Sequence, residues 1–150
     1  MLVVRRLALL VSALVAATLL NGCAIGSLGP DPSPRAGLDC VDDSDVCVRQ
    51  RGAALRSLMA DKSNKWVREP ATPAAHASGV RLFAYRGKRR ELSCGDLHHG
   101  KREAEQAATG LRRSGGGLTP AQISRASMLG AEVARELAGE IRRRCRGARR

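Results

Sequence analysis

The segment that most constrains the fold is the last regular stretch of the chain, residues 119–145. It opens with Thr119-Pro120-Ala121-Gln122, which combines an N-cap threonine, a proline at the first helical position and a capping-box glutamine. Apolar or small residues then recur at steps of three or four, at Ile123, Ser127, Gly130, Ala134, Leu137, Ile141 and Cys145. This spacing predicts about seven turns of a single amphipathic helix, whose apolar side must pack against another element.

A second helix is expected directly before it, over residues 94–113, with Ser93 as the N-cap. Its apolar positions near one face are Leu97, Ala104, Ala108 and Leu111. Residues 114–117, which are serine and three glycines, end the pattern. Because a connection this short joins antiparallel neighbours, we expect the two segments to form an antiparallel helical hairpin.

The earlier part of the domain gives weaker signals. Ser44 and the two aspartates before it offer N-caps for an amphipathic helix that fades near residues 61–64. Residues 70–79 are a loop rich in helix-breaking residues. Residues 80–86 alternate in a way that suits a short strand, although a turn of helix is equally allowed.

The shortage of aromatic residues favours helices over a β-sandwich. Trp66, Phe83 and Tyr85 are the whole aromatic inventory, so the core must be built from Leu, Val, Ile, Met and many Ala residues. We therefore predict a mainly α fold: a small, disulfide-stapled helical domain with a C-terminal antiparallel helical hairpin. A short strand near residues 80–86 is left as an alternative.

The start of the chain has the pattern of an export signal. Arg5 and Arg6 precede residues 7–20, an apolar or small run without a charge. A helix of that length spans about 21 Å, which is too short for a bilayer core of about 30 Å but typical of a signal-peptide apolar region. The run ends in Leu20-Asn21-Gly22-Cys23, which resembles the lipobox of bacterial lipoproteins. The alternative is a buried core helix that happens to end in a cysteine.

The resemblance implies how the chain is divided and where it is held. Residues 1–22 would be a cleaved signal peptide, and Cys23 would carry a diacylglycerol thioether and an N-acyl chain as its only attached group, with no other cofactor. Ala24, in place of an aspartate, favours the periplasmic face of the outer membrane over that of the inner membrane. Residues 23–39, rich in Pro and Gly, would form the lipidated N-terminus and a flexible tether. Residues 40–145 would be the helical domain and residues 146–150 a basic tail.

Setting Cys23 aside leaves an even number of cysteines for an oxidising compartment: Cys40, Cys47, Cys94 and Cys145. Four cysteines allow three pairings, and the sequence alone does not choose among them. In the predicted hairpin the last helix comes level with Cys94 near Gly139 and ends slightly beyond it, which makes a Cys94–Cys145 disulfide feasible. Cys40 and Cys47 would then close a small loop at the start of the first helix. The two crossed pairings stay open.

No metal site or catalytic constellation is expected. The segment Cys94-x-Asp96-x-His98-His99 gathers ligand-type residues, but on a helix only two of them at a time share a face. The carboxylates Glu103, Glu105, Glu132, Glu136 and Glu140 are spaced as solvated helix charges. There is no Gly-x-Ser-x-Gly elbow, and the glycines after Ser114 lack the Lys-Ser/Thr of a phosphate loop. We expect no enzyme activity; an enzyme would need a concave pocket around His98 or His99.

Positive charge is concentrated at the end of the chain. The net charge is +12, of which residues 141–150 contribute +6. The candidate anion-binding residues are Arg142, Arg143, Arg144, Arg146, Arg149 and Arg150. The simpler interpretation is a frayed, solvated C-terminus whose cations are favourable beside the negative end of the last helix.

The partners follow from the expected location. Beyond its signal, the chain resembles small envelope lipoproteins only in type, which suggests a structural or protein-interaction role at the membrane. The alternative is a basic binding module for anionic envelope polymers such as lipopolysaccharide or phospholipid headgroups; an unrecognised enzyme is the third. Nucleic acid is not expected, because the signal directs the chain out of the cytoplasm and three aromatic residues supply little base stacking. The sequence does not set the oligomeric state.

Overall fold

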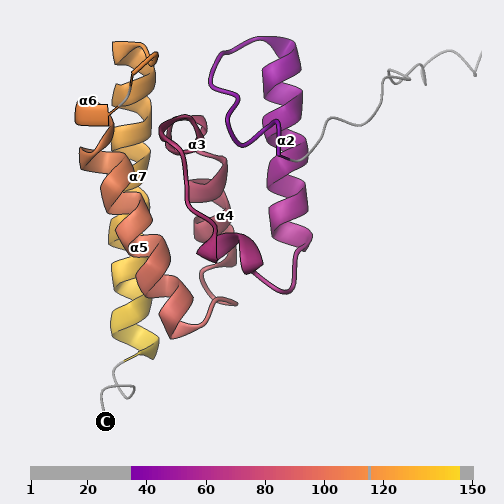
Figure 1. The fold of residues 1–150 in the computed structure, drawn as a ribbon. Helices are drawn as coiled ribbons and strands as arrows, with labels where there is room; N and C mark the ends of the chain where they lie inside the picture. Colours follow the sequence, from indigo (N-terminus) through magenta and orange to yellow (C-terminus); the bar gives the residue numbers. More distant parts are fainter. Residues whose placement is uncertain (1–34, 115, 146–150) are drawn as a thin grey trace, which may run out of the picture. The chain divides into compact units, whose positions relative to one another are not determined.

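The computed structural model describes residues 35–114 and 116–145, and these residues are mainly helical (Figure 1). In chain order the elements are α2 (Asp45–Ala60), the 3-10 helix η1 (Lys65–Arg68), α3 (Pro73–Ser78), α4 (Val80–Lys88), α5 (Cys94–Thr109), α6 (Leu111–Ser114) and α7 (Pro120–Arg144). No β-strand occurs within these two ranges, so the predicted mainly α class is confirmed. The expected signal peptide, Cys23, the tether as far as residue 34 and the tail at 146–150 lie outside the described residues.

The helix starts are fixed by the capping residues that the sequence indicated. The Ser44 side chain accepts a hydrogen bond from the Cys47 backbone N–H at the start of α2, and Ser93 does the same for α5. At the start of α7, Thr119 and Gln122 form a complete capping box, with distances of 3.3 Å and 2.8 Å between the paired nitrogen and oxygen atoms. Each contact satisfies a helix-end N–H group that would otherwise lack a partner.

The predicted antiparallel hairpin is formed by α5 and α7, which lie side by side along most of their length (Figure 1). The disulfide between Cys94 and Cys145 joins the start of α5 to the end of α7, with their Cα atoms 5.8 Å apart. At Gly130 of α7 a Cβ atom would lie only 2.6 Å from the Ala104 carbonyl oxygen. The glycine therefore permits the close approach of the two helices. The second disulfide joins Cys40 to Cys47, so the preferred pairing is the one observed.

One predicted helix is divided in two. The expected helix over residues 94–113 ends at Thr109, and the chain turns at Gly110 before the single turn of α6. A Cβ atom at residue 110 would lie 2.7 Å from the Gln106 carbonyl oxygen, so this turn requires glycine.

The loop expected over residues 70–79 contains a helix. Thr72 accepts a hydrogen bond from the Ala75 backbone N–H at 3.0 Å and Pro73 is the first residue of α3, which is the same Thr-Pro start as that of α7. Gly79, with a φ of 73°, then lets the chain turn directly from α3 into α4.

The strand alternative for residues 80–86 is wrong, because these residues belong to α4. The helix packs against α2 on one side and against α3, α5 and α7 on others. Its buried residues therefore surround the helix rather than follow one stripe, and over a short segment this resembles alternation. They are Val80, Arg81, Leu82, Ala84, Tyr85 and Lys88.

The core is built mainly from aliphatic residues, as the composition indicated. It joins η1, α4, α5, α7 and the residues next to them, through Trp66, Val67, Leu82, Ala84, Tyr85, Leu92, Leu97, Ala104, Ala107, Val133, Leu137 and Cys145. The buried residues of α7 match the predicted apolar positions only in part. They are Ala126, Gly130, Val133, Leu137 and Glu140. None of the helices described above is both long enough and apolar enough to cross a membrane.

Candidate functional site

An open cavity of about 730 Å³ lies between the last turn of α4 and one face of α7. We call it the arginine groove. Its lining residues are Arg86, Arg89, Arg135, Glu136, Gly139, Arg142 and Arg143. Five guanidinium groups thus face a single carboxylate, which is an arrangement suited to an anion.

The α7 side of the groove follows from helical spacing. Arg135, Gly139 and Arg142 are separated by four and three residues, so they share one face of the helix. A Cβ atom at Gly139 would have an Arg142 nitrogen, 3.9 Å away, as its nearest neighbour. The missing side chain at this position therefore leaves open space between the two arginines.

The arginines of the groove differ in how their charge is balanced. Arg86 Nη2 lies 2.8 Å from a Glu132 carboxylate oxygen and 3.1 Å from one of Glu136. Arg135 and Arg142, in contrast, form no ion pair with any residue in the described ranges. Their charge is uncompensated. Arg89 has no ion pair in these ranges either, but its Nη1 atom donates a hydrogen bond of 2.6 Å to the Arg86 carbonyl oxygen. Arg135 and Arg142 are therefore the arginines of the groove whose donors are most available to an anionic ligand.

Arg143 is also partly engaged. Its Nη2 atom lies 2.5 Å from Glu140 Oε2, and that carboxylate is buried rather than solvated as its spacing suggested. Burial of Glu140 is tolerated because Arg143 and Arg144 both pair with it from the following turn.

The end of α7 is held rigidly beside the groove. Arg144 donates hydrogen bonds to the carbonyl oxygens of Arg89, Arg90 and Leu92 at 3.1, 2.9 and 3.1 Å. The disulfide at Cys145 fixes the next residue. The interpretation of a frayed C-terminus is therefore wrong as far as Cys145.

The structure thus changes the set of candidate residues. Of the six predicted arginines, Arg142 and Arg143 line the groove and Arg144 is committed to backbone carbonyls. Arg146, Arg149 and Arg150 lie outside the described residues. Sequence reasoning missed Arg86, Arg89 and Arg135. The spacing of Arg135 from Arg142 was a usable signal, whereas the α4 arginines join them only through packing.

Another arginine, Arg81, lies in the core, and each of its three guanidinium nitrogens donates a hydrogen bond. It is 3% exposed and forms two hydrogen bonds of 2.6 Å to the two carboxylate oxygens of Glu103, which is 5% exposed. Further hydrogen bonds reach the carbonyl oxygens of Trp66 at 2.9 Å and Glu69 at 3.0 Å. The expectation that Glu103 is a solvated helix charge is therefore wrong. Its partner comes from another helix, which spacing within α5 does not reveal.

Tyr85 completes this buried cluster. Its hydroxyl donates a hydrogen bond of 2.9 Å to Glu103 Oε2, and its ring lies 4.7 Å from that of Trp66, centroid to centroid. Burial, together with the neighbouring Glu103 carboxylate, raises the pKa of Tyr85 above its ordinary value, so the phenol stays protonated. Every charge in the cluster has a partner, which is typical of a structural unit.

The histidines lie in different surroundings. His98 is exposed, as expected, whereas His99 is half-buried and lines a cavity of about 240 Å³ with Glu103, Arg102 and Gln106 among others. The concave pocket that an enzyme would need is therefore present at His99. The Glu103 carboxylate in it is already held by Arg81, and the residues found to line it include no serine or cysteine.

His76 is a buried imidazole in α3. It is 9% exposed, and its Nδ1 atom has no hydrogen-bond partner among the residues that the structure describes. Burial lowers the pKa of His76, because the charged form loses hydration there.

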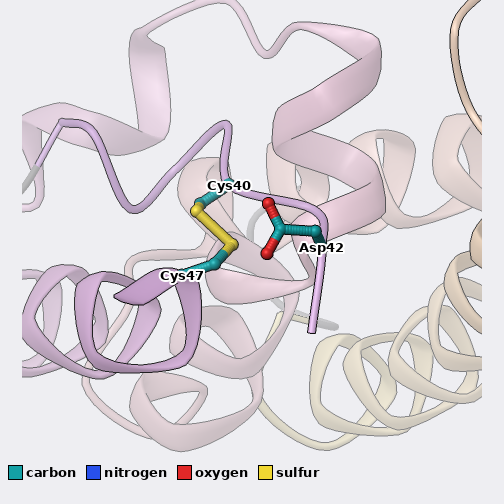
Figure 2. Close-up of side chains that lie close together, drawn as sticks. All are labelled: Cys40, Asp42 and Cys47. Carbon is teal, nitrogen blue, oxygen red and sulfur yellow. A yellow bond between two sulfur atoms is a disulfide. The ribbon is translucent and has the colours of Figure 1, made fainter. Parts of the chain in front are cut away.

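One group of ligand-type side chains lies together at the start of α2. Figure 2 shows the Asp42 carboxylate beside the Cys40–Cys47 disulfide, and the ligand atoms of the three residues lie within 4.8 Å of one another. Cysteine binds zinc as a thiolate, and in the disulfide the two sulfurs are bonded to each other. In this state only the Asp42 carboxylate is a ligand.

In the Cys-x-Asp-x-His-His segment of α5, the first two ligand-type side chains are engaged in other interactions. Cys94 is in a disulfide, and Asp96 accepts hydrogen bonds from Arg68 and from the Ser93 hydroxyl.

Comparisons with models of protein families, with curated proteins and with solved structures found no match to this chain. The argument for its function therefore rests on its own residues.

Proposed function

We propose that this chain is a lipid-anchored envelope protein whose helical domain binds anionic groups of the envelope in the arginine groove. Cys23 carries the lipid, residues 24–39 space the domain from the membrane, and the groove takes phosphate-bearing headgroups or polymers. The role of the groove is binding, without a chemical reaction at that site. The observation that carries the proposal is that the Arg135 and Arg142 side chains form neither an ion pair nor a hydrogen bond within the described residues, in a groove already rich in positive charge.

The chemistry of arginine supports phosphate as the preferred ligand group. A guanidinium presents a planar fork of N–H donors that matches phosphate oxygens, and it keeps its charge at any physiological pH. Each arginine near an anionic surface contributes about 1 kcal/mol of binding, and salt screens the attraction. Lipopolysaccharide and phospholipids supply such phosphates where the lipobox resemblance implies that the chain resides.

The test uses residues 24–150, exported behind a signal peptide that is cleaved without lipidation, so that neither the lipid nor the apolar run of residues 7–20 binds vesicles. Binding is measured by co-sedimentation with phosphatidylglycerol vesicles, with phosphatidylcholine vesicles as the neutral comparison. Arg135→Gln/Arg142→Gln is expected to weaken binding about 30-fold, because two contributions of about 1 kcal/mol are removed. Pull-down on lipopolysaccharide reports whether the same groove takes that polymer.

The matched control is Arg49→Gln/Arg56→Gln, which removes the same charge from two exposed positions on α2. It should leave binding nearly unchanged. A further variant, Gly139→Leu, fills the groove without changing charge and should weaken binding as well. Equal losses in the groove and α2 variants would show attraction to net charge alone and would overturn the proposal.

The anchor has its own test. Radiolabelled palmitate is expected to enter the wild-type chain and not the Cys23→Ala variant, and membrane fractionation then separates outer-membrane from inner-membrane residence. Failure of labelling would overturn the lipoprotein part while leaving the groove to be tested separately.

A structural or protein-interaction role is the second candidate, and a different surface favours it. A cavity of about 370 Å³ is lined by Phe83, Leu129 and Val41, with Asp43 and Arg125 among the other lining residues. Phe83 is 45% exposed, which is unusual for one of only three aromatic side chains. A photo-crosslinking residue placed at Phe83 in intact cells should capture a protein if this role holds. Capture only from a groove position such as Arg89 would contradict it.

A further inference from the structure

The two sulfurs of the Cys40–Cys47 disulfide lie in different surroundings. Cys47 is the third residue of α2 and is 1% exposed. Cys40 lies in the segment before the helix and is half-buried. An external molecule therefore reaches the Cys40 sulfur more readily than that of Cys47.

The surroundings of Cys47 stabilise a thiolate. Its position in the first helical turn places the sulfur near the positive end of α2. Arg51, one turn later, points a guanidinium nitrogen at the sulfur from 3.5 Å. The same nitrogen donates to the carbonyl oxygens of Asp42 at 2.6 Å and Cys40 at 3.3 Å, which holds it in place.

The surroundings of Cys40 suit a thiol. Its sulfur lies 3.2 Å from the Gln50 side-chain oxygen, which is a hydrogen-bond acceptor. A disulfide sulfur has no hydrogen to donate, whereas a thiol does. Both sulfurs thus have a neighbour that interacts fully only with a reduced or partly reduced form.

The other disulfide lacks these features. Cys94 is the first residue of α5 and lies at the positive end of that helix. Cys145 follows the last residue of α7, where the negative end of the helix disfavours a thiolate. No hydrogen bond reaches either of these sulfurs from the residues that the structure describes. Among the described residues, a hydrogen bond from a cationic side chain to a disulfide sulfur is found at the Cys40–Cys47 pair and not at Cys94–Cys145.

We propose that Cys40–Cys47 is a thiol–disulfide exchange site in which Cys40 is the attacked sulfur. An external thiolate forms a bond to Cys40 Sγ, the Cys40–Cys47 bond breaks, and its electron pair leaves on Cys47 Sγ as a thiolate beside Arg51. The product is a mixed disulfide at Cys40, and attack by the Cys47 thiolate reverses the step. A leaving thiol of low pKa departs faster, so Arg51 favours this direction of cleavage.

The charge around the site selects the class of thiol. The Asp42 carboxylate faces the disulfide (Figure 2). Asp39 and Asp45 are its neighbours in sequence, whereas Asp43 is paired with Arg51 and Arg125. The Ser44 hydrogen bonds, with Arg51, hold the pKa of Asp42 below its usual range, so the carboxylate is charged at neutral pH. The site therefore takes a neutral or cationic thiol, as a small molecule or as the cysteine of an exchange protein, in preference to an anionic thiol.

The experiment uses the full mature chain with both disulfides formed, in the presence of a chelator. The protein is treated with a limiting amount of cysteamine, quenched with acid, alkylated with N-ethylmaleimide and mapped by mass spectrometry. The expected products are a cysteamine adduct on Cys40 and an alkylated Cys47, with Cys94–Cys145 intact. An adduct mainly on Cys47, or opening of both disulfides at equal rates, would overturn the proposal.

Variants test the two charges separately. Arg51→Gln should slow formation of the Cys40 adduct about threefold and raise the pKa of the Cys47 thiol, read from the pH dependence of its alkylation in the reduced protein. Arg51→Lys should restore most of the rate, and Arg49→Gln, on the same helix without contact to the sulfurs, should change nothing. Unchanged exchange in Arg51→Gln would count against the proposal.

For substrate class, the ratio of the rates with cysteamine and with mercaptoethanesulfonate is measured in wild-type protein and in Asp42→Asn. The ratio should fall in the variant. Circular dichroism verifies that each variant keeps its helices, which the Cys94–Cys145 disulfide continues to staple.

Discussion

Arg81 and Arg142 are both helical arginines, but their donors are used in opposite ways. Arg81 is almost wholly buried, and its hydrogen bonds reach Glu103 and two carbonyl oxygens. Arg142 is exposed at the arginine groove and forms no ion pair within the described part of the chain. The difference teaches that positive charge alone does not mark a binding site, because many basic side chains serve the fold. The donors that the fold leaves unused mark the site.

The largest expected effect comes from breaking the buried pair. Glu103→Ala leaves Arg81 charged and without its carboxylate in the core, so we expect the free energy of unfolding to fall by about 3–5 kcal/mol in urea titration. Glu105→Ala is the control, since Glu105 is exposed and, among the residues that the structure describes, its carboxylate pairs only with Lys101 across one helical turn. It should cost about 0.5 kcal/mol or less. Similar losses in both variants would show that the buried cluster is not a special unit.

The next effect concerns the disulfide that holds the end of α7. Cys94→Ala/Cys145→Ala should lower the free energy of unfolding by about 2–4 kcal/mol. It should also weaken binding to anionic vesicles, because Arg142 and Arg143 are no longer held beside α4. The comparison variant, Cys40→Ala/Cys47→Ala, removes a disulfide whose cysteines are 7 rather than 51 residues apart in sequence. It should cost about 2 kcal/mol less and leave vesicle binding intact. A larger loss from the shorter loop would contradict this assignment.

A smaller effect should appear as a pH dependence. The buried His76 has its pKa lowered in the folded chain, whereas the unfolded chain takes up a proton near 6.5. The unfolded state therefore binds more protons as the pH falls, and stability that is present above 6.5 is lost below it. His76→Gln should flatten the dependence of the unfolding free energy on pH between about 7 and about 5. An unchanged slope would place the titrating group elsewhere.

Local signals in the sequence were sufficient for much of the fold. The caps at Ser44, Ser93 and Thr119, together with helical periodicity, predicted α2, α5 and α7, and the hairpin geometry favoured the disulfide pairing that is observed. The Thr72-Pro73 start of α3 carried the same signal and was missed because breaker residues surround it. Residues 80–86 were ambiguous because α4 is buried on several sides, which removes the stripe that marks an amphipathic helix.

The candidate site was harder to predict, because it depends on partners that are distant in sequence. Glu103 and Glu105 look alike on α5, yet only Glu103 meets Arg81, 22 residues earlier. Likewise, Arg142 and Arg144 are neighbours in a basic run, but one faces the groove and the other binds backbone carbonyls. Composition predicted where positive charge is concentrated. Packing decides which of these charges remain free.

The smallest expected effect on stability is at the groove itself. Arg135→Gln/Arg142→Gln should change the free energy of unfolding by about 0.5 kcal/mol or less, because no partner in the described ranges loses an interaction. A slight increase in the free energy of unfolding would also agree with the contrast between Arg81 and Arg142, because the substitutions remove two like charges from one cavity. Urea titration of this variant together with Glu103→Ala measures the smallest and the largest expected change in the free energy of unfolding in one experiment. A loss above about 1 kcal/mol would mean that these arginines serve the fold as Arg81 does, and the distinction between used and unused donors would fail.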